Sequence, residues 1–311
     1  MTGETFNQVH LSAHDRETLQ RKGFLVLRGF LEPTQLQALS EDALFAQLYA
    51  TENLFPSLLA QHGGVLTCYD RTPTGIVSAE EYLTKIRWST SADSESAASV
   101  CRAVVSLAQA ALSCCFDQAP QPSIFLYNEQ FICKPPTRSI YSAFDIHRDR
   151  DYDAIDKYCR RPGTVALWGP LSGPVSRLNG ALCMVPRSEE SHFSAFLANY
   201  GVSMDMPSAF TSAALCDALM TSAEAPLQAS HAELLAMDPG DIVVFADDVW
   251  HWSVPNRGKR CSIHATGRRV PFMLDCQMRV AWMAQFSADV VHSKRRGGAP
   301  AALAVYLPVA A

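Results

Sequence analysis

Short stretches rich in β-forming residues recur through the second half of the chain and limit its fold more than any other feature. Turn residues such as Asn179, Gly180, Pro239 and Gly240 stand between some of them. Short strands divided by turns are typical of β-sandwiches and barrels. We therefore predict a mainly β protein with flanking helices and a double-stranded β-helix core, a cupin-like jelly roll. The expected strands span residues 123–133, 138–147, 163–169, 181–186, 241–246 and 260–266.

Helical patterns precede this series of strands. A short amphipathic pattern leads into a turn at Gly23 and a strand over residues 24–28, and Pro33 marks the start of the next helix. Residues 51–78 are rich in loop-forming residues, and no functional residue is expected there. The expected helices span residues 15–22, 33–50, 79–88 and 96–116.

The chain is expected to form one domain over residues 1–311, because no linker-like stretch divides it. A hydrophobic content of 48% is ample for a sizeable core. Residues 193–236 interrupt the strands with a helical, Ala- and Ser-rich sequence, which would form either a lid or a structural buttress. Residues 270–286 are expected to add a last strand or two, and the apolar tail 299–311 to dock on the body.

Charge and cysteine content argue against several classes of protein. The formal net charge is −5, and the basic cluster at residues 292–296 is too short for a nucleic-acid-binding face. No apolar stretch reaches about eighteen residues and no signal peptide is evident, so a membrane protein is not expected. The ten cysteines are scattered without metal-binding CxxC spacing. They indicate reduced core residues and a cytoplasmic protein.

A His-x-Asp triplet formed by His147 and Asp149 supplies the strongest chemical signal. Side chains two positions apart on a strand point to the same face, so the imidazole and the carboxylate could bind one metal ion. The triplet alone is weak, since such pairs arise by chance and often lie on the surface. His251 follows an apolar strand and a short polar loop, and it is the candidate third ligand. Two histidines and one carboxylate form the facial triad of non-haem Fe(II) enzymes, with metal positions left open.

A basic residue is expected beside this triad. Arg260 opens the stretch 260–266, and Ser253 lies two positions after His251, where it could share the same face. A fixed guanidinium binds a carboxylate through two hydrogen bonds. A cosubstrate that chelates iron at one end and carries a carboxylate at the other would fit, and 2-oxoglutarate has that shape. Arg257 is the rival to Arg260, and a serine in a polar loop could instead face water.

With these residues in place, the chain resembles the phytanoyl-CoA dioxygenase-like family of Fe(II)- and 2-oxoglutarate-dependent oxygenases. The resemblance covers most of the chain and implies Fe(II), 2-oxoglutarate and O2 as cofactor and cosubstrates. It also implies that Gln130 contacts the cosubstrate or the substrate. The matching residues outside the ligands are Gly23 to Leu27, Gln130, Lys134, Pro135, Trp168, Asn179, Gly180, Pro186 and Ser188.

The chain departs from the family pattern just after Pro186. Arg187 stands where a glycine is expected and Glu189 where a histidine is expected, while His192 is displaced by three positions. The loop there is expected to take another path. Related halogenases carry a small residue at the position of Asp149, so its carboxylate disfavours halogenation.

The resemblance implies oxidation of a small-molecule metabolite, most simply its hydroxylation, with release of succinate and CO2. Desaturation, epoxidation and rearrangement are also open outcomes. Arg150, Phe245 and His264 match positions near the substrate in the ectoine hydroxylase branch. One alternative is a non-catalytic jelly-roll binding protein with a vestigial metal site, and another is a protein hydroxylase, which would need a long groove. The sequence specifies neither the substrate nor the oligomeric state.

Overall fold

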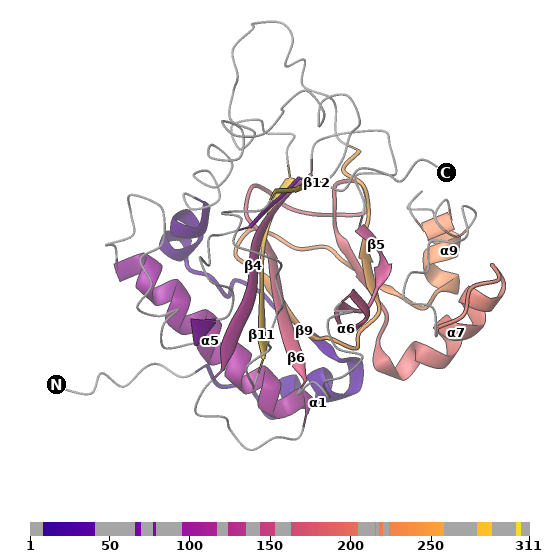
Figure 1. Cartoon of the computed structure of the whole chain (residues 1–311), viewed down its shortest axis with the longest axis horizontal. Helices are drawn as coiled ribbons and strands as arrows, with labels where there is room; N and C mark the ends of the chain where they lie inside the picture. The colour runs from indigo at the N-terminus through magenta and orange to yellow at the C-terminus, as the bar shows by residue number, and fades with distance from the viewer. Residues whose placement is uncertain are drawn as a thin grey trace, which may run out of the picture.

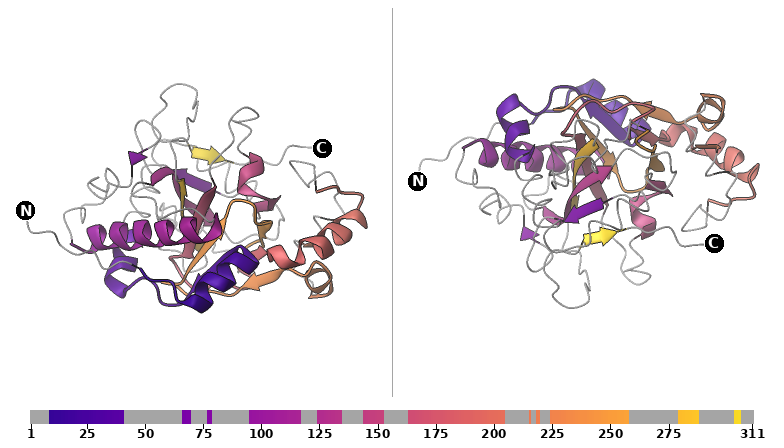
Figure 2. Two further views of the ribbon diagram at one scale, coloured as in Figure 1. Left: turned by 90° about the horizontal axis from the view of Figure 1, so that it is seen from below. Right: turned by 90° about the horizontal axis from the view of Figure 1, so that it is seen from above.

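Two antiparallel β-sheets form the body of the molecule, with helices packed around them (Figure 1). Chain segments far apart in sequence meet in both sheets, as the views from below and above also show (Figure 2). The computed structural model describes residues 9–40, 66–69, 77–78, 95–116, 124–134, 144–152, 163–204, 215, 218–219, 224–257, 279–287 and 303–305.

The larger sheet has eight strands in the order β1-β9-β6-β11-β4-β2-β12, with β3 paired to β4. Its central strands β6, β9 and β11 are almost entirely buried, which fits their continuous apolar sequences. These strands are β1 (Phe24–Leu27), β2 (Leu66–Tyr69), β3 (Val77–Ser78), β4 (Phe125–Lys134), β6 (Thr164–Pro170), β9 (Ile242–Ala246), β11 (Arg279–Ser287) and β12 (Leu303–Val305).

The smaller sheet has four strands in the order β5-β10-β7-β8. Its register places His251 of β10 directly opposite His147 of β5, and Met184 of β7 on the other side of His251. The two histidines of the predicted triad therefore lie on neighbouring strands. The strands are β5 (Phe144–His147), β7 (Leu182–Met184), β8 (Glu233–Leu235) and β10 (His251–Ser253).

Apolar residues form two layers, one on each side of the larger sheet. The outer layer joins α1 (Ala13–Lys22) and α5 (Glu95–Cys115) to alternate residues of that sheet, such as Val165 and Leu167. The inner layer fills the space between the sheets with the intervening residues, such as Ala166 and Trp168. The strict alternation of strand side chains produces this division.

Gly23 connects the first helix to β1 of the larger sheet. It ends α1 with a φ of 79°, in the left-handed region that glycine adopts without strain. A Cβ atom at this position would lie 2.5 Å from Val249 Cγ2. The glycine is therefore required both by the helix end and by the close approach of the loop that precedes His251.

Most sequence predictions for regular structure are confirmed within the described residues. The jelly-roll fold class, the first helix, α5 and the strands β4, β6, β7 and β9 agree with expectation to within a few residues. The strand predicted within residues 270–286 corresponds to β11, and residues 303–305 of the tail pair with β2. Residues 41–50, 79–88 and 260–266 lie outside the described part of the chain.

Two local predictions are wrong. The loop-rich stretch 51–78 contains β2 and β3, which pair with β4. The segment 193–236, which was predicted to be helical, contains strand β8. The helix α9 (Glu224–Ala229) also lies within this segment, and α7 (Glu190–Ala198) overlaps its start. In each case pairing with a neighbouring strand outweighs the weak local preference.

Among the residues that could be searched, no helix is long and apolar enough to cross a membrane. Cys114, Cys115 and Cys183 are free thiols.

Candidate metal centre

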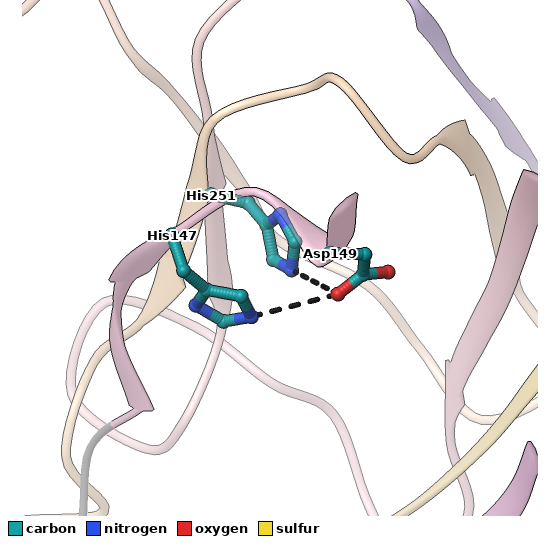
Figure 3. Close-up of side chains that lie close together, drawn as sticks. All are labelled: His147, Asp149 and His251. Carbon is teal, nitrogen blue, oxygen red and sulfur yellow. Dashed lines mark ion pairs between the residues drawn. The ribbon is translucent and has the colours of Figure 1, made fainter. Parts of the chain in front are cut away.

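His147, Asp149 and His251 converge at the edge of the smaller sheet (Figure 3). The Nε2 atoms of both histidines lie 3.6 Å from Oδ1 of Asp149. This distance is too long for a hydrogen bond. The three ligand atoms lie within 4.8 Å of one another, and the ring centroids of the two histidines are 4.2 Å apart. Two imidazole nitrogens and one carboxylate oxygen thus face a common point, which suits Fe(II).

Hydrogen bonds hold the ligands in this orientation. Nδ1 of His251 lies 2.9 Å from the carbonyl oxygen of Val249, so its N–H donates there and Nε2 keeps its lone pair for a metal. The Gln285 amide on β11 donates to Oδ2 of Asp149 at 2.8 Å, which leaves Oδ1 facing the histidines. The rings of Phe245 and His251 pack edge to face, with centroids 4.8 Å apart. Each contact fixes an atom that a metal would need.

Burial and neighbouring charges keep the ligands in the protonation states that a metal requires. Burial is the main cause that lowers the pKa of His251 to about 4, and His147 lowers it further, so the imidazole is neutral at neutral pH. Burial alone would raise the pKa of Asp149, but His147, His251 and Gln285 together hold it below its usual value. The carboxylate is therefore ionised and the His251 imidazole is neutral.

The structure corrects the predicted backbone around the triplet. Strand β5 ends at His147, and Asp149 is the first residue of the short helix α6 (Asp149–Tyr152), not a strand residue on the same face. The Arg150 N–H donates to the Asp247 carbonyl oxygen at 3.2 Å and ties the start of α6 to the end of β9. The chain turns at Arg148, and this turn brings Asp149 back towards the two imidazoles.

Arg148 lies between His147 and Asp149 in the chain, but its side chain binds other residues. Its guanidinium forms an ion pair with Asp151 at 2.7 Å and lies 4.4 Å from the centroid of the Trp250 ring. Arg150 is exposed.

Beside the triad, a lysine and a serine are buried together. The Lys134 ammonium donates to the Ser253 hydroxyl and, at 3.0 Å, to the Val254 carbonyl oxygen. Burial lowers the pKa of Lys134 to about 7, because among the described residues its hydrogen-bond partners are neutral. Ser253 is two residues from His251 on β10 and also accepts the N–H of Phe144 at 3.0 Å. An anion at this point would stabilise the charged lysine.

Three of the other predicted residues lie within the described part of the chain and two lie outside it. Gln130 lies on β4, opposite Met283 of β11, and Phe245 is a buried residue of β9. Arg257 is exposed, and its N–H donates to the Leu178 carbonyl oxygen at 2.7 Å. Arg260 and His264 lie outside the described residues.

Sequence reasoning missed two residues of the centre. Gln285 is 136 positions from Asp149, and no spacing rule connects β11 with the triplet. The polar amide inside the apolar run VAWMAQF was a usable signal, because a buried polar group needs a partner. Lys134 was predicted only as a residue that matches the family pattern. Its position at the end of an apolar strand was a usable signal as well, because a buried charged group also needs partners.

A family model described as phytanoyl-CoA dioxygenase (PhyH) matches residues 19–262. No curated protein matches the chain.

Similar solved structures include EvdO2 from Micromonospora carbonacea var. aurantiaca complexed with 2-oxoglutarate. It has 17% identity and a TM-score of 0.48, and the match covers 96% of this chain and 94% of that chain. EctD from S. alaskensis, with 2-oxoglutarate and 5-hydroxyectoine, has 14% identity and a TM-score of 0.48 over 92% of this chain and 79% of the other. The carbocyclase SnoK from nogalamycin biosynthesis has 14% identity and a TM-score of 0.45 over 89% and 84%.

Proposed function

Because the chain belongs to the phytanoyl-CoA dioxygenase family over residues 19–262, we propose that His147, Asp149 and His251 bind the Fe(II) of a 2-oxoglutarate-dependent oxygenase. The convergence of their three ligand atoms, all within 4.8 Å of one another, is the observation that carries this proposal. The donor set fits the metal, since His251 presents a neutral Nε2 and Asp149 an ionised Oδ1.

When bound, iron supplies the oxidising chemistry that couples O2 and the decarboxylation of 2-oxoglutarate to oxidation of the substrate. The protein contributes position and a water-poor environment. Phe245 and the Val249 carbonyl hold the His251 ring, and Gln285 holds Asp149. These contacts keep the ligands from rotating when the substrate binds, so that one face of the site stays open to it.

Lys134 and Ser253 are proposed to bind the distal carboxylate of 2-oxoglutarate. The buried ammonium has a lowered pKa of about 7, and a carboxylate would favour its charged form. The Ser253 hydroxyl already lies within hydrogen-bond distance of Lys134 Nζ and could donate to the same anion. Arg260 and Gln130 remain proposed members of this site on the strength of the sequence.

The substrate is proposed to be a small metabolite that is hydroxylated. Arg150 is exposed next to Asp149, which suits contact with a polar or anionic group outside the iron site. Phe245 packs on His251 and could support an apolar part of the substrate there. His264 is proposed as a third contact, from the sequence.

We also propose a single domain in a reducing cytoplasm. Cys114 and Cys115 are adjacent in the chain and Cys183 is buried near Lys134, and all three are free thiols, as a reducing compartment predicts. The segment 193–236 is proposed to act partly as a buttress, because Phe193 and Leu197 of α7 are fully buried. A lid remains a proposal for its residues outside the described part.

Formation of succinate tests the function directly. Purified protein is incubated with Fe(II), 2-oxoglutarate and O2, alone and with a panel of small metabolites. We expect succinate that depends on all three components and rises with the correct metabolite, while a metal chelator abolishes it. Tight binding of a metabolite without succinate formation would instead support a non-catalytic jelly-roll binding protein.

A further inference from the structure

A second group of two histidines and one carboxylate lies on the surface, outside the oxygenase centre. Nδ1 of His192 is 2.9 Å and Nδ1 of His231 is 3.0 Å from Oε2 of Glu189. The two imidazole rings are stacked, with centroids 4.5 Å apart and planes 11° from parallel. We call these three residues the surface cluster. Its ligand atoms lie within 4.8 Å of one another.

Three separate elements bring the surface cluster together. Glu189 ends the 3-10 helix η3 (Arg187–Glu189), His192 lies in the first turn of α7, and His231 lies in the turn between α9 and β8. A chain distance of 42 residues separates Glu189 from His231. α7 and α9 accordingly lie side by side at one end of the molecule (Figures 1 and 2). The departure from the family pattern at Glu189 and His192 therefore creates a specific contact.

The backbone of His231 is unusual. Its φ of 55° lies in the left-handed region, and it is the one such non-glycine residue among those described. Its own N–H donates to the Gln228 carbonyl oxygen at 3.1 Å, which fixes the turn. This conformation directs the imidazole onto Glu189 and His192. A disfavoured backbone that completes a set of metal-type ligands is consistent with a role in binding.

The geometry points to a transition-metal site of the zinc type at Glu189, His192 and His231, and we propose that it binds Zn²⁺. Zinc bonds nitrogen and oxygen at about 2.0–2.2 Å in tetrahedral sites, which places ligand atoms about 3.3 Å apart. The observed separations of 2.9 and 3.0 Å need a small expansion, and because the two rings are stacked with planes 11° from parallel, one imidazole must rotate before both Nδ1 lone pairs point at one ion. Imidazole ligands favour zinc over Mg²⁺ or Ca²⁺. Both histidines are exposed, so water can take the fourth position.

A bound ion would join the start of α7 to the turn before β8. The inner face of α7 reaches the strand that carries His251, because Phe193 stacks on Trp252 with centroids 6.1 Å apart and contacts Trp250 at 5.9 Å. Zinc at the surface cluster would thus brace the outer side of the helix whose inner side supports the oxygenase centre. Its expected role is structural.

The competing explanation is a hydrogen-bonded trio without metal, in which both imidazoles donate Nδ1–H to Glu189. Zinc binding by the full-length protein, freed of metal with a chelator, distinguishes the two. Equilibrium dialysis against Zn²⁺ followed by elemental analysis gives the zinc content per chain. Wild type is expected to bind one zinc more than the double variant His192→Gln/His231→Asn. Asparagine at position 231 tolerates the left-handed backbone. His14→Gln, an exposed histidine on α1, is the control and should match wild type.

A second readout identifies the coordination. Cobalt(II) in a four-coordinate site gives intense visible bands, whereas six-coordinate cobalt absorbs weakly. These intense bands are expected in wild type and in His251→Ala, and they should be absent from the double variant. Glu189→Gln should raise the dissociation constant for zinc by about tenfold or more. Equal zinc content and equal cobalt spectra in wild type and the double variant would overturn the proposal.

Discussion

The buried triad and the surface cluster use the same residue types, two histidines and one carboxylate, in opposite settings. In the triad the side chains of His147, Asp149 and His251 are 12%, 8% and 6% exposed, whereas His192 and His231 are 61% and 44% exposed. In the triad Nδ1 of His251 is engaged by a backbone carbonyl and Nε2 faces the carboxylate. In the surface cluster both Nδ1 atoms face it directly.

The difference separates a site for chemistry from a site for cross-linking. Burial strengthens electrostatic interactions and excludes water, which a reactive centre needs, and contacts behind each ligand keep its orientation. The surface cluster lies in water and could hold an ion, but it could not protect a reactive intermediate. The residue types alone would not distinguish the two sites, since each has two histidines and one carboxylate. Burial and the partners behind the ligands decide between them.

The largest expected effect is loss of a triad ligand. His251→Ala should lower 2-oxoglutarate-dependent succinate formation by more than about 100-fold, the upper range for loss of a residue that only supports a ligand. His147→Ala and Asp149→Ala should do the same. His14→Gln is the matched control. Activity of any triad variant near that of wild type would remove the distinction between the two clusters.

A Gln285 variant tests whether the hydrogen bond from Gln285 to Asp149 contributes to the binding of Fe(II). Gln285→Ala removes the donor to Asp149 Oδ2 and should raise the dissociation constant for Fe(II) by about 10- to 100-fold. Anaerobic equilibrium dialysis of Fe(II) measures this constant. Gln228→Ala, whose amide donates to Glu224 on the surface, should leave it unchanged. Equal constants for the two variants would mean that Asp149 needs no second partner.

A Lys134 variant tests the proposed binding of the 2-oxoglutarate carboxylate beside the triad. Lys134→Met should raise the KM for 2-oxoglutarate by about thirtyfold, because one charge-assisted hydrogen bond contributes about 2 kcal/mol. Initial rates of succinate formation at varied 2-oxoglutarate give the KM. Lys22→Met, which removes an ion pair with Glu233 elsewhere, is the control. A normal KM in Lys134→Met would assign the carboxylate to other residues.

The smallest expected effect concerns Asp247, whose carboxylate accepts the N–H and hydroxyl of Thr164 at 3.1 and 2.9 Å. Burial is the main cause that raises its pKa from 3.8 to about 6. The folded state therefore binds more protons than the unfolded state, and stability falls as pH rises from about 4 to about 6. Asp247→Asn should remove this part of the dependence, on the order of 2 kcal/mol.

Urea unfolding of wild type and Asp247→Asn across this pH range measures that difference. Asp238→Asn, at an exposed position, serves as the control. Identical pH dependence in wild type and Asp247→Asn would show that Asp247 is more hydrated than its burial implies.

Much of the fold and the convergence of the three triad residues could be predicted from the sequence. Central strands such as β6 and β9 have continuous apolar sequences, and their burial explains why they could be predicted. His147 and His251 could be paired because each lies at or next to a strand. Asp149 was predicted to share a strand face with His147, but it starts a helix, and its carboxylate still lies beside the two imidazoles.

Contacts between distant segments could not be predicted in the same way. Gln285 meets Asp149 only because β11 lies in the centre of the larger sheet, and β8 forms only because β7 is its neighbour. The surface cluster shows the same limit. His192 and Glu189 were seen as departures from a pattern, but nothing in the sequence placed His231 beside them.

The buried triad is proposed to bind Fe(II) and 2-oxoglutarate together. Anaerobic titration of the metal-free protein with Fe(II) and 2-oxoglutarate tests it most directly, because chelation of iron by the 2-oxo acid produces a visible charge-transfer absorption. We predict that this absorption saturates at one iron per chain in wild type and in His14→Gln and is lost in His251→Ala. Its full development in His251→Ala, or its absence from wild type, would contradict the account.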